Sequence, residues 1–150
     1  MITAEILKKR KEHADSTFVH EDMSYVLVYR NPKSWENARS YARLLGGELA
    51  TIPNDIVNTL CAEQLIARKL TTAWIGLTDQ NEERNFSWVS GAPLTYTHWL
   101  RREPNNRARK PADSRGEDHV VLHSNYGWND HNGYEDAGHY FPFFVEYSNI

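Results

Sequence analysis

The chain has a single cysteine, Cys61, among its 150 residues. One cysteine cannot form a disulfide within the domain, so the sequence excludes a small fold held together by internal bridges. Cys61 lies in a segment that predicts a helix. Its thiol is therefore expected to be a small buried apolar group, with a reactive thiol as the alternative.

Long apolar runs are also missing. No stretch approaches the ~20 apolar residues that cross a bilayer, and residues 1–30 lack the short apolar segment of a signal peptide. We therefore expect no membrane insertion. If the protein acts outside the cell, either a longer chain or a different export route has to account for it.

An excess of positive charge is absent too. The chain carries 17 basic and 20 acidic residues, for a net charge of −3. A general nucleic-acid binder needs a clustered positive face, so we expect no nucleic-acid partner. One group of basic residues lies at 8–11, within a predicted surface helix or tail. They form either a solvated face or a surface for an acidic partner. The length fits one domain, divided here into a tail at 1–16 and a domain at 17–150.

The first half of the domain alternates strand and helix patterns. Residues 17–20 and 25–29 are rich in aromatic and β-branched side chains around a polar turn, which predicts a hairpin. Ser34 is a plausible N-cap, and Gly46-Gly47 ends the helix that it starts. The apolar face predicted for this helix consists of Trp35, Ala38, Ala42 and Leu45.

A second helix is predicted after Pro53-Asn54-Asp55, and it ends before Thr71-Thr72. Its expected apolar stripe consists of Ile56, Leu60, Cys61, Leu65 and Ile66. A strand then begins at Trp74. About 20 residues between Trp99 and His119 show little strand character, and such a loop in a small domain is usually functional or disordered.

Oxygen-bearing side chains recur in three short pieces of the second half. They are Glu103-Pro104-Asn105, Glu117-Asp118 and Trp128-Asn129-Asp130. Calcium takes six to eight oxygen ligands from carboxylates, carbonyls and water, and these pieces offer both carboxylates and amides. Each piece alone could equally be a turn or a loop cap. Their combination predicts a calcium site.

The order of these pieces resembles the C-type lectin-like domain, over roughly residues 24–147. Further segments share the resemblance: Ser34–Arg39, Leu44–Ile52, Trp74–Leu77, Phe86–Trp99 and Phe144–Tyr147. It implies an α+β, C-type lectin-like fold, with two helices flanking small antiparallel sheets and a long calcium-binding loop region. It also implies a cis peptide bond between Glu103 and Pro104.

The resemblance assigns the metal ligands Glu103, Asn105, Glu117, Asn129 and Asp130. In this family the Glu-Pro-Asn order accompanies mannose-type selectivity, for mannose, glucose, N-acetylglucosamine and fucose, whereas Gln-Pro-Asp accompanies galactose. Two vicinal sugar hydroxyls would bind the ion, donate hydrogen bonds to Glu103 and Glu117, and accept them from Asn105 and Asn129. Glycans are therefore the expected partners.

A second calcium site is implied at Asp79, Glu83, Asn106 and Asp118. The alternative is that Asp79 and Glu83 belong to a polar turn and that Asp118 is a surface acid. The basic loop from Arg107 to Arg115 either is solvated or contacts an anionic polysaccharide or another charged cell-surface carbohydrate, with Arg107 as the expected contact.

The family usually has two disulfides, and the resemblance places Ala42 with Val145 and His119 near Gly133 at their positions. Their loss favours a bacterial or viral member, or one made in a reducing compartment. The histidines His119, His123, His131 and His139 allow a zinc interpretation, although they form no compact ligand set in sequence. Core or surface roles are favoured for them, and core roles are favoured for Trp74, Trp88, Trp99 and Trp128.

Three functions remain open from the sequence. The favoured one is a calcium-dependent, non-enzymatic carbohydrate-binding domain. The alternative is a protein-binding or adhesive module with structural calcium only. A glycosidase that uses Glu103 and Glu117 is disfavoured because no apolar pocket is evident to raise either pKa. Calcium sites of this kind fill at extracellular concentrations, which predicts an extracellular or cell-surface location. Single lectin sites bind weakly, so an oligomer is a reasonable expectation.

Overall fold

The computed structural model describes residues 2–104 and 116–150. Its helices are α1 (Ala4–Lys11), α2 (Trp35–Leu44) and α3 (Asp55–Ala67), with short 3-10 helices η1 (Ala14–Ser16) and η2 (Glu135–Ala137). Its strands are β1 (Thr17–His20), β2 (Met23–Lys33), β3 (Glu48–Leu49), β4 (Thr72–Thr78), β5 (Ser87–Trp88), β6 (His119–His123), β7 (Trp128–His131) and β8 (Phe141–Ser148). The fold is α+β, as expected.

The strands connect into one sheet in the order β1-β2-β8-β4-β6-β7, with β3 beside β8 and β5 beside β4. The pairings are antiparallel except for β4 and β8, which meet in parallel at Trp74 and Phe143. The expected antiparallel pairing is therefore present, and the described strands join into one mixed sheet rather than several small ones. The partners of the parallel pair are nearly 70 residues apart in the chain, so no local pattern could reveal it.

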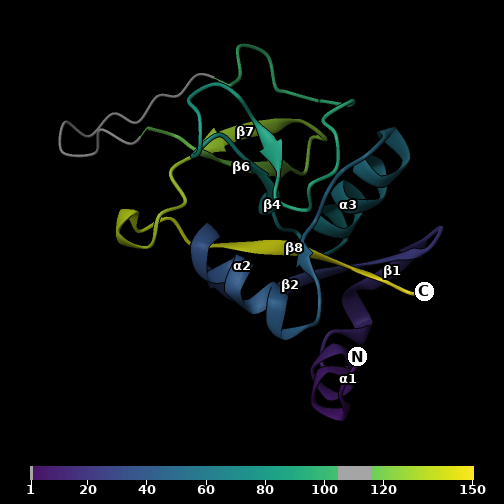
Figure 1. Cartoon of the computed structure of the whole chain (residues 1–150). Helices are drawn as coiled ribbons and strands as arrows, with labels where there is room; N and C mark the ends of the chain where they lie inside the picture. The colour runs from purple at the N-terminus through teal and green to yellow at the C-terminus, as the bar shows by residue number, and fades with distance from the viewer. Residues whose placement is uncertain (1, 105–115) are drawn as a thin grey trace.

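Successive side chains along a strand point to opposite faces of the sheet, so neighbouring residues of β2 pack against different helices. Val26 and Val28 pack with Trp35, Ala38 and Ala42 of α2 in one apolar cluster. Tyr25 and Leu27, one residue out of phase, belong to a second cluster with Val57, Cys61 and Leu65 of α3. Helices α2 and α3 therefore cover opposite faces, with the loops that follow β4 above them in Figure 1.

Helix α2 begins and ends as predicted. The side chain of Ser34 accepts a hydrogen bond from the backbone N–H of Asn37 at 3.2 Å. Gly46 then adopts a φ of 75°, a left-handed conformation that favours glycine and ends the helix. The predicted apolar face is confirmed, because Trp35, Ala38 and Ala42 are buried with Leu45 beyond the helix.

Helix α3 begins at the predicted place, and its predicted apolar stripe is confirmed only at Cys61 and Leu65, which are fully buried. Asn54 caps it, accepting a hydrogen bond from the N–H of Val57 at 3.0 Å. Ile56 and Ile66 were predicted to be buried, but they are 56% and 49% exposed. The buried positions are Val57, Asn58, Cys61, Ala62 and Leu65. Apolar residues lie all round this helix, so their spacing in the sequence did not identify which face would be buried.

Cys61 is fully buried, and burial raises the pKa of its thiol. It is the expected small apolar group. Ala42 and Val145 are also fully buried, in one apolar cluster. His119 Nδ1 accepts a hydrogen bond from the N–H of Gly133 at 2.9 Å. Both positions assigned to family disulfides are thus occupied by noncovalent contacts.

Helix α1 packs against the domain. Arg10 donates a hydrogen bond to the carbonyl of Leu45 at 2.8 Å, and its guanidinium lies 3.6 Å from the centre of the Tyr147 ring. His13 Nε2 is 2.9 Å from the hydroxyl of Tyr41. Lys8 and Lys11 remain exposed. Of the basic quartet, Arg10 therefore has a structural role.

Candidate metal centre

The segment that carries Glu103 lies beside β7. Trp99 and Trp128 form a parallel bridge, in which the N–H of Trp128 donates to the carbonyl of His98 at 2.8 Å. The N–H of Leu100 donates to the carbonyl of Trp128 at 2.9 Å, and the N–H of Glu103 donates to Leu100 at 2.9 Å. The peptide bond between Glu103 and Pro104 is cis, as expected. The backbone thus holds the first ligand piece next to the third.

Strand β7 carries the next two ligands. Asn129 is half-buried, and its Oδ1 is buried without a hydrogen-bond partner in the described part of the chain. Asp130 is 1% exposed and pairs with Val120 of β6. Glu117 lies two residues before β6 and is half-buried. Strands β6 and β7 therefore connect the second and third pieces.

The structure brings these pieces onto neighbouring segments without forming a tight cage. Within residues 2–104 and 116–150, Glu103, Glu117 and Asp130 are not a set whose ligand atoms all lie within 4.8 Å of one another. Three carboxylates repel one another at such distances, and a bound cation would offset that repulsion. Asn105, Asn106 and Arg107 lie outside the described residues.

A compact acidic cluster does form at Asp79, Glu83 and Asp118. Each offers a carboxylate oxygen, and these oxygens all lie within 4.8 Å of one another. Asp79 and Asp118 are each 3% exposed, whereas Glu83 is exposed. Asp79 does begin a polar turn, in which the N–H of Glu82 donates to its carbonyl at 3.1 Å, but it is a buried member of that turn. The surface-acid alternative is wrong for Asp118, because Asp118 is buried.

Regular structure positions the acidic cluster. Strands β4 and β6 pair at Thr78 and His119, so Asp79 and Asp118 lie at adjacent strand ends. The N–H of Asp79 donates to the carbonyl of Asp118 at 3.1 Å. Asp79 Oδ2 accepts from the N–H of Arg84 at 2.7 Å, and Asp118 Oδ2 accepts from the hydroxyl of Tyr134 at 2.7 Å. One oxygen of each carboxylate is thus fixed by the protein.

The other oxygens, Asp79 Oδ1 and Asp118 Oδ1, are buried without hydrogen-bond partners in the described residues. Burial raises the pKa of Asp79, the N–H of Arg84 opposes that shift, and the neighbouring Asp118 and Glu83 add to it, so that the pKa is about 7. Buried polar atoms normally have partners. These two oxygens, like Asn129 Oδ1, fit the donor set of a hard cation such as calcium.

The histidines do not form a zinc site in the described ranges. The set at Asp79, Glu83 and Asp118 is the one described group of three His, Cys, Asp or Glu side chains with ligand atoms this close. His119 is fully buried and uses both ring nitrogens, with Nε2 lying 2.8 Å from Gln80 Oε1. Burial lowers the pKa of His131, and the nearby His139 and His123 add to this shift, so that the pKa is about 4.

The tryptophans are core residues, as predicted for Trp74, Trp88 and Trp128. Trp99 is half-buried and packs against Trp128, with ring centres 5.8 Å apart. Sequence reasoning did not identify Asn58, whose side chain donates to the carbonyl of Tyr126 and accepts from the indole of Trp128. Its position among the apolar residues of α3 was the only available signal.

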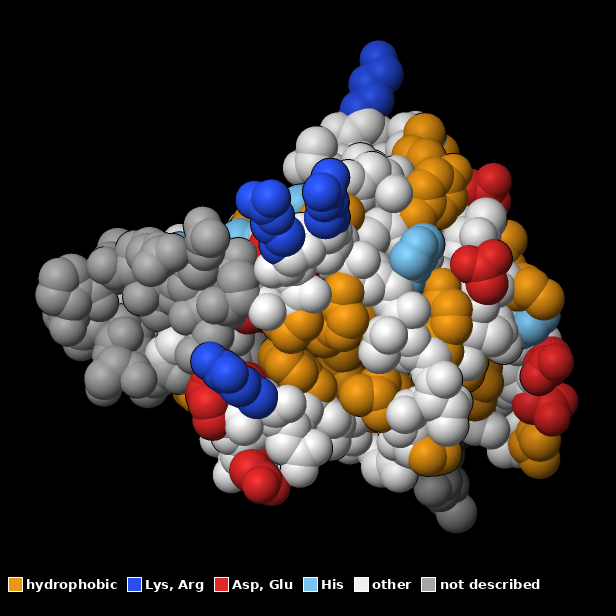
Figure 2. All heavy atoms as spheres, turned by 90° about the horizontal axis from the view of Figure 1, so that it is seen from above, with side chains coloured by type: hydrophobic (Ala, Val, Ile, Leu, Met, Phe, Trp, Pro, Cys, Tyr) orange, Lys and Arg blue, Asp and Glu red, His pale blue; other side chains and the backbone are white. Residues whose placement is uncertain are grey.

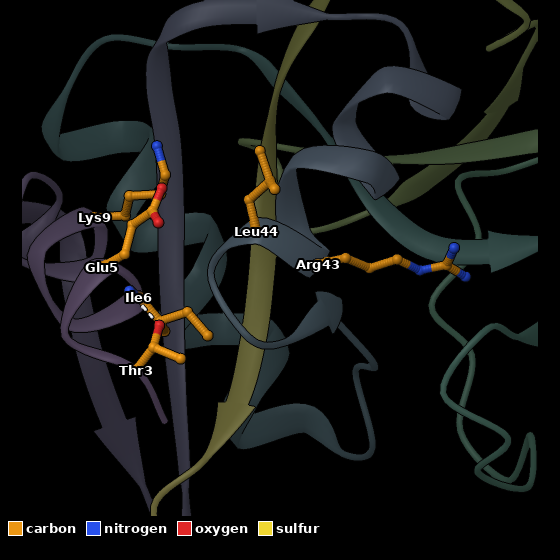
Figure 3. A pocket seen from close by; sticks show the side chains of 6 residues that line it. All are labelled: Thr3, Glu5, Ile6, Lys9, Arg43 and Leu44. Atoms are coloured by element: carbon orange, nitrogen blue, oxygen red, sulfur yellow. Dashed lines mark hydrogen bonds between the residues drawn. The ribbon is translucent and has the colours of Figure 1, made fainter. Parts of the chain in front are cut away.

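The surface near the N-terminus is hollowed. A small open hollow of about 200 Å³ lies between α1 and the end of α2, at the bottom of the molecule in Figure 1 (Figure 3). Its lining is Thr3, Glu5, Ile6, Lys9, Arg43 and Leu44. On the upper face, acidic and basic side chains are both present between apolar patches, so no single charge dominates it (Figure 2).

Comparisons with known proteins agree with this architecture. The family model of the lectin C-type domain matches residues 31–138. CD209 antigen-like protein D of Mus musculus is 32% identical over 104 residues, which cover 67% of this chain and 40% of that protein. The chain thus matches less than half of this longer relative.

Solved structures share the fold. The mouse scavenger receptor C-type lectin carbohydrate-recognition domain superposes with a TM-score of 0.75 at 21% identity, covering 91% of this chain and 97% of that one. A calcium-independent type II antifreeze protein superposes with a TM-score of 0.70 at 17% identity, covering 90% and 93%. The fold alone therefore does not fix the use of calcium.

Among the described residues, no helix has the length and apolar character needed to span a membrane. The lectin C-type family consists of non-enzymatic carbohydrate-binding domains that typically use calcium. The family match covers more than half of the sequence. The chain belongs to the C-type lectin domain family.

Proposed function

We propose that this domain binds carbohydrate through a calcium ion held by side chains of the long-loop region. The ligands are Glu103, Asn105, Glu117, Asn129 and Asp130. Residues 17–150 form the carbohydrate-recognition domain, and residues 1–16 form its N-terminal extension. The sugar coordinates the ion directly through two vicinal hydroxyls, which the same ligand side chains also contact.

The observation that carries this proposal is the placement of Glu103 and Asn129. Backbone hydrogen bonds through Trp128 hold their two segments together. Asn129 Oδ1 is buried and lacks a hydrogen-bond partner in the described residues. A buried amide oxygen without a hydrogen-bond partner costs free energy unless a ligand supplies the partner. A calcium ion would satisfy it, while the amide N–H groups remain available to a sugar.

A second calcium ion is proposed at Asp79, Glu83 and Asp118, with Asn106 as a further ligand. Its support is the pair of buried oxygens Asp79 Oδ1 and Asp118 Oδ1. A cation there would offset the mutual repulsion of three carboxylates. This ion would order the base of the loop, and it would not contact sugar.

Mannose-type selectivity follows from the order of acid and amide around Pro104. The double variant Glu103→Gln with Asn105→Asp reverses that order. We expect it to lose retention on mannose and to gain retention on galactose in the presence of calcium. The control is Glu82→Gln, an exposed acid-to-amide change in another loop. Unchanged preference in the double variant would refute mannose-type selectivity by this mechanism.

Arg107 is proposed to contact an anionic group beside the metal-bound sugar. An exposed contact of this kind weakens with salt. We expect Arg107→Ala to lower affinity for an anionic polysaccharide severalfold at low salt and to leave binding of neutral mannose unchanged. Equal affinity of wild type and variant for the polysaccharide would refute the contact.

The main test is a glycan array run in calcium and in chelator, with Asn129→Ala as the site variant. We expect calcium-dependent binding to mannose-type glycans that Asn129→Ala abolishes. Asn31→Ala is the matched control, because Asn31 is an exposed residue of β2 and outside the ligand set. Absent or calcium-independent binding would overturn the proposal and favour the protein-binding or adhesive module.

The proposed location is extracellular or on a cell surface. Exposed calcium sites of this kind have dissociation constants of roughly 10⁻⁴ to 10⁻³ M, which a resting cytosol leaves empty. A single weak sugar site also favours use in an oligomer or in several copies. Sedimentation of the purified protein, with and without calcium, tests the oligomer.

A further inference from the structure

Asn58 is a fully buried amide on α3 whose polar atoms join three chain segments. Its Nδ2 donates to the carbonyl of Tyr126 at 2.8 Å and lies 2.9 Å from His98 Nδ1. Its Oδ1 accepts from the indole Nε1 of Trp128 at 2.8 Å. One side chain therefore ties helix α3 to two separate parts of the long-loop region.

Two partners of Asn58 belong to the segments that carry the proposed ligands. His98 lies five residues before Glu103, and Trp128 directly precedes Asn129. The backbones of His98 and Trp128 are themselves hydrogen-bonded at 2.8 Å. Asn58 thus fixes the side chains at the point where the Glu103 and Asn129 segments meet, although it is not a ligand itself.

Helix α3 presents a second polar contact one turn earlier. Asp55 Oδ1 accepts a hydrogen bond from the hydroxyl of Tyr96 at 3.1 Å. Burial and this contact with Asp55 raise the pKa of Tyr96 to about 12, so the hydroxyl keeps its proton and donates at neutral pH. Asp55 and Asn58 lie three residues apart on one side of the helix. Figure 1 shows α3 beneath the loops that they contact.

Replacing Asn58 by an apolar residue would leave the Trp128 Nε1–H and the Tyr126 carbonyl without this partner in a dry environment. Such groups are costly to bury unsatisfied, so the indole would shift to find water or another acceptor. The ring of Trp128 packs edge-on against those of Trp88 and Trp99, with centres 5.6 and 5.8 Å away. A shift of Trp128 would therefore move Asn129 relative to Glu103.

We propose that Asn58 is a positioning residue for the calcium site, acting through Trp128. This inference rests on the proposed function, because it assumes that Glu103 and Asn129 bind calcium. Groups that orient metal ligands typically contribute 10- to 100-fold to metal affinity. The expected effect of Asn58→Leu is a roughly tenfold rise in the calcium concentration needed for half-maximal retention on mannose resin.

The matched control is Asn54→Ala in the same helix. Asn54 caps α3, so its loss destabilises the helix, but Asn54 has none of the contacts to His98, Tyr126 or Trp128. We expect Asn54→Ala to lower the melting temperature without changing the calcium requirement of the folded protein. A rise equal to that of Asn58→Leu would show a general stability effect and overturn the positioning role.

A double-mutant cycle with Trp128→Phe tests the route of the effect. Phenylalanine removes the indole N–H, so the two changes should be strongly non-additive in calcium requirement. Additive effects would overturn the link through Trp128. If Asn58→Leu does not fold by circular dichroism, Trp128→Phe alone replaces it, because it removes the same hydrogen bond between Asn58 Oδ1 and the indole. A roughly threefold rise is expected from one lost hydrogen bond, and no change would overturn the proposal.

The outcome for wild-type protein separates the two proposals. Calcium-dependent retention of wild type with an unchanged calcium requirement in Asn58→Leu would overturn the role of Asn58 alone. Failure of wild type to bind mannose resin in calcium would overturn the proposed function, and the role of Asn58 with it.

Discussion

The two acidic regions of this domain differ in how much regular structure builds them. Asp79 and Asp118 lie at the ends of paired strands, and the cluster that they form with Glu83 is compact. Glu103 and Glu117 lie outside the strands, and with Asp130 they do not converge to the same degree among the described residues. One region is prearranged by the sheet, and the other depends on loop segments.

This difference has an electrostatic consequence. Bringing carboxylates together in a buried place raises their pKa values, as at Asp79 with its pKa of about 7. The carboxylates of the prearranged cluster therefore repel one another, and a bound cation would offset that repulsion. The looser region avoids that cost and leaves its ligands room to adjust around an ion and a sugar. We infer that the cluster serves ordering and the looser region serves recognition.

The largest expected effect separates these two roles directly. Asp130→Asn removes a ligand of the recognition site and should weaken calcium-dependent mannose binding by about 100-fold. Asp79→Asn makes the same chemical change in the acidic cluster and should leave mannose binding within severalfold of wild type at saturating calcium. Glycan binding measured across a calcium titration gives both values.

Equal losses in these two variants would break the comparison. They would mean that the two acidic regions act as one coupled site. Glu82→Gln, which changes an exposed acid beside the cluster, should match wild type in either case.

A smaller effect concerns stability. Asp79→Asn removes buried like-charge repulsion and should raise the melting temperature in chelator. It should also reduce the stabilisation that calcium gives to wild type. For one site at a calcium concentration ten times the dissociation constant, that stabilisation is ~1.4 kcal/mol in the free energy of unfolding. Differential scanning calorimetry with and without calcium measures both changes. An unchanged calcium-induced rise would show that no ion binds at Asp79.

Local signals in the sequence predicted most of the frame on which these regions lie. Ser34 and Asn54 have the side chains of N-caps, and both cap helices. Residues 17–20 and 25–29 predict a hairpin, and β1 and β2 form one, with Phe18 opposite Tyr25. Such features depend on a few neighbouring residues, so they can be inferred without the fold.

What the sequence could not predict depends on contacts between distant segments. The parallel contact of Trp74 with Phe143 and the burial of Asn58 both require knowledge of what packs opposite. The same holds for the acidic regions. Their residues were identified from resemblance, but only the sheet register puts Asp79 beside Asp118 and leaves Glu103 and Glu117 less closely gathered.

The smallest expected effect is the pH dependence of stability that arises from the titration of Asp79. Its folded-state pKa is raised from 3.8 to about 7, so between these values the folded protein binds a proton that the unfolded protein does not. This contribution to stability is fully present below about pH 3.8 and is lost as the pH rises through about 7. In calcium-free buffer, wild type should therefore lose stability relative to Asp79→Asn as the pH rises from 5 to 8.

The informative quantity is the difference in melting temperature between wild type and Asp79→Asn. Burial also raises the pKa of Glu146, which lies outside both acidic regions, so its titration contributes to wild type and variant alike and cancels. Calcium should flatten the difference, because an ion at the cluster favours the charged carboxylate and displaces the proton. Melting temperatures of both proteins at pH 5, 6, 7 and 8 measure it. A difference that does not change with pH would mean that Asp79 is ionised throughout, and that the acidic cluster is no more strained than the recognition site.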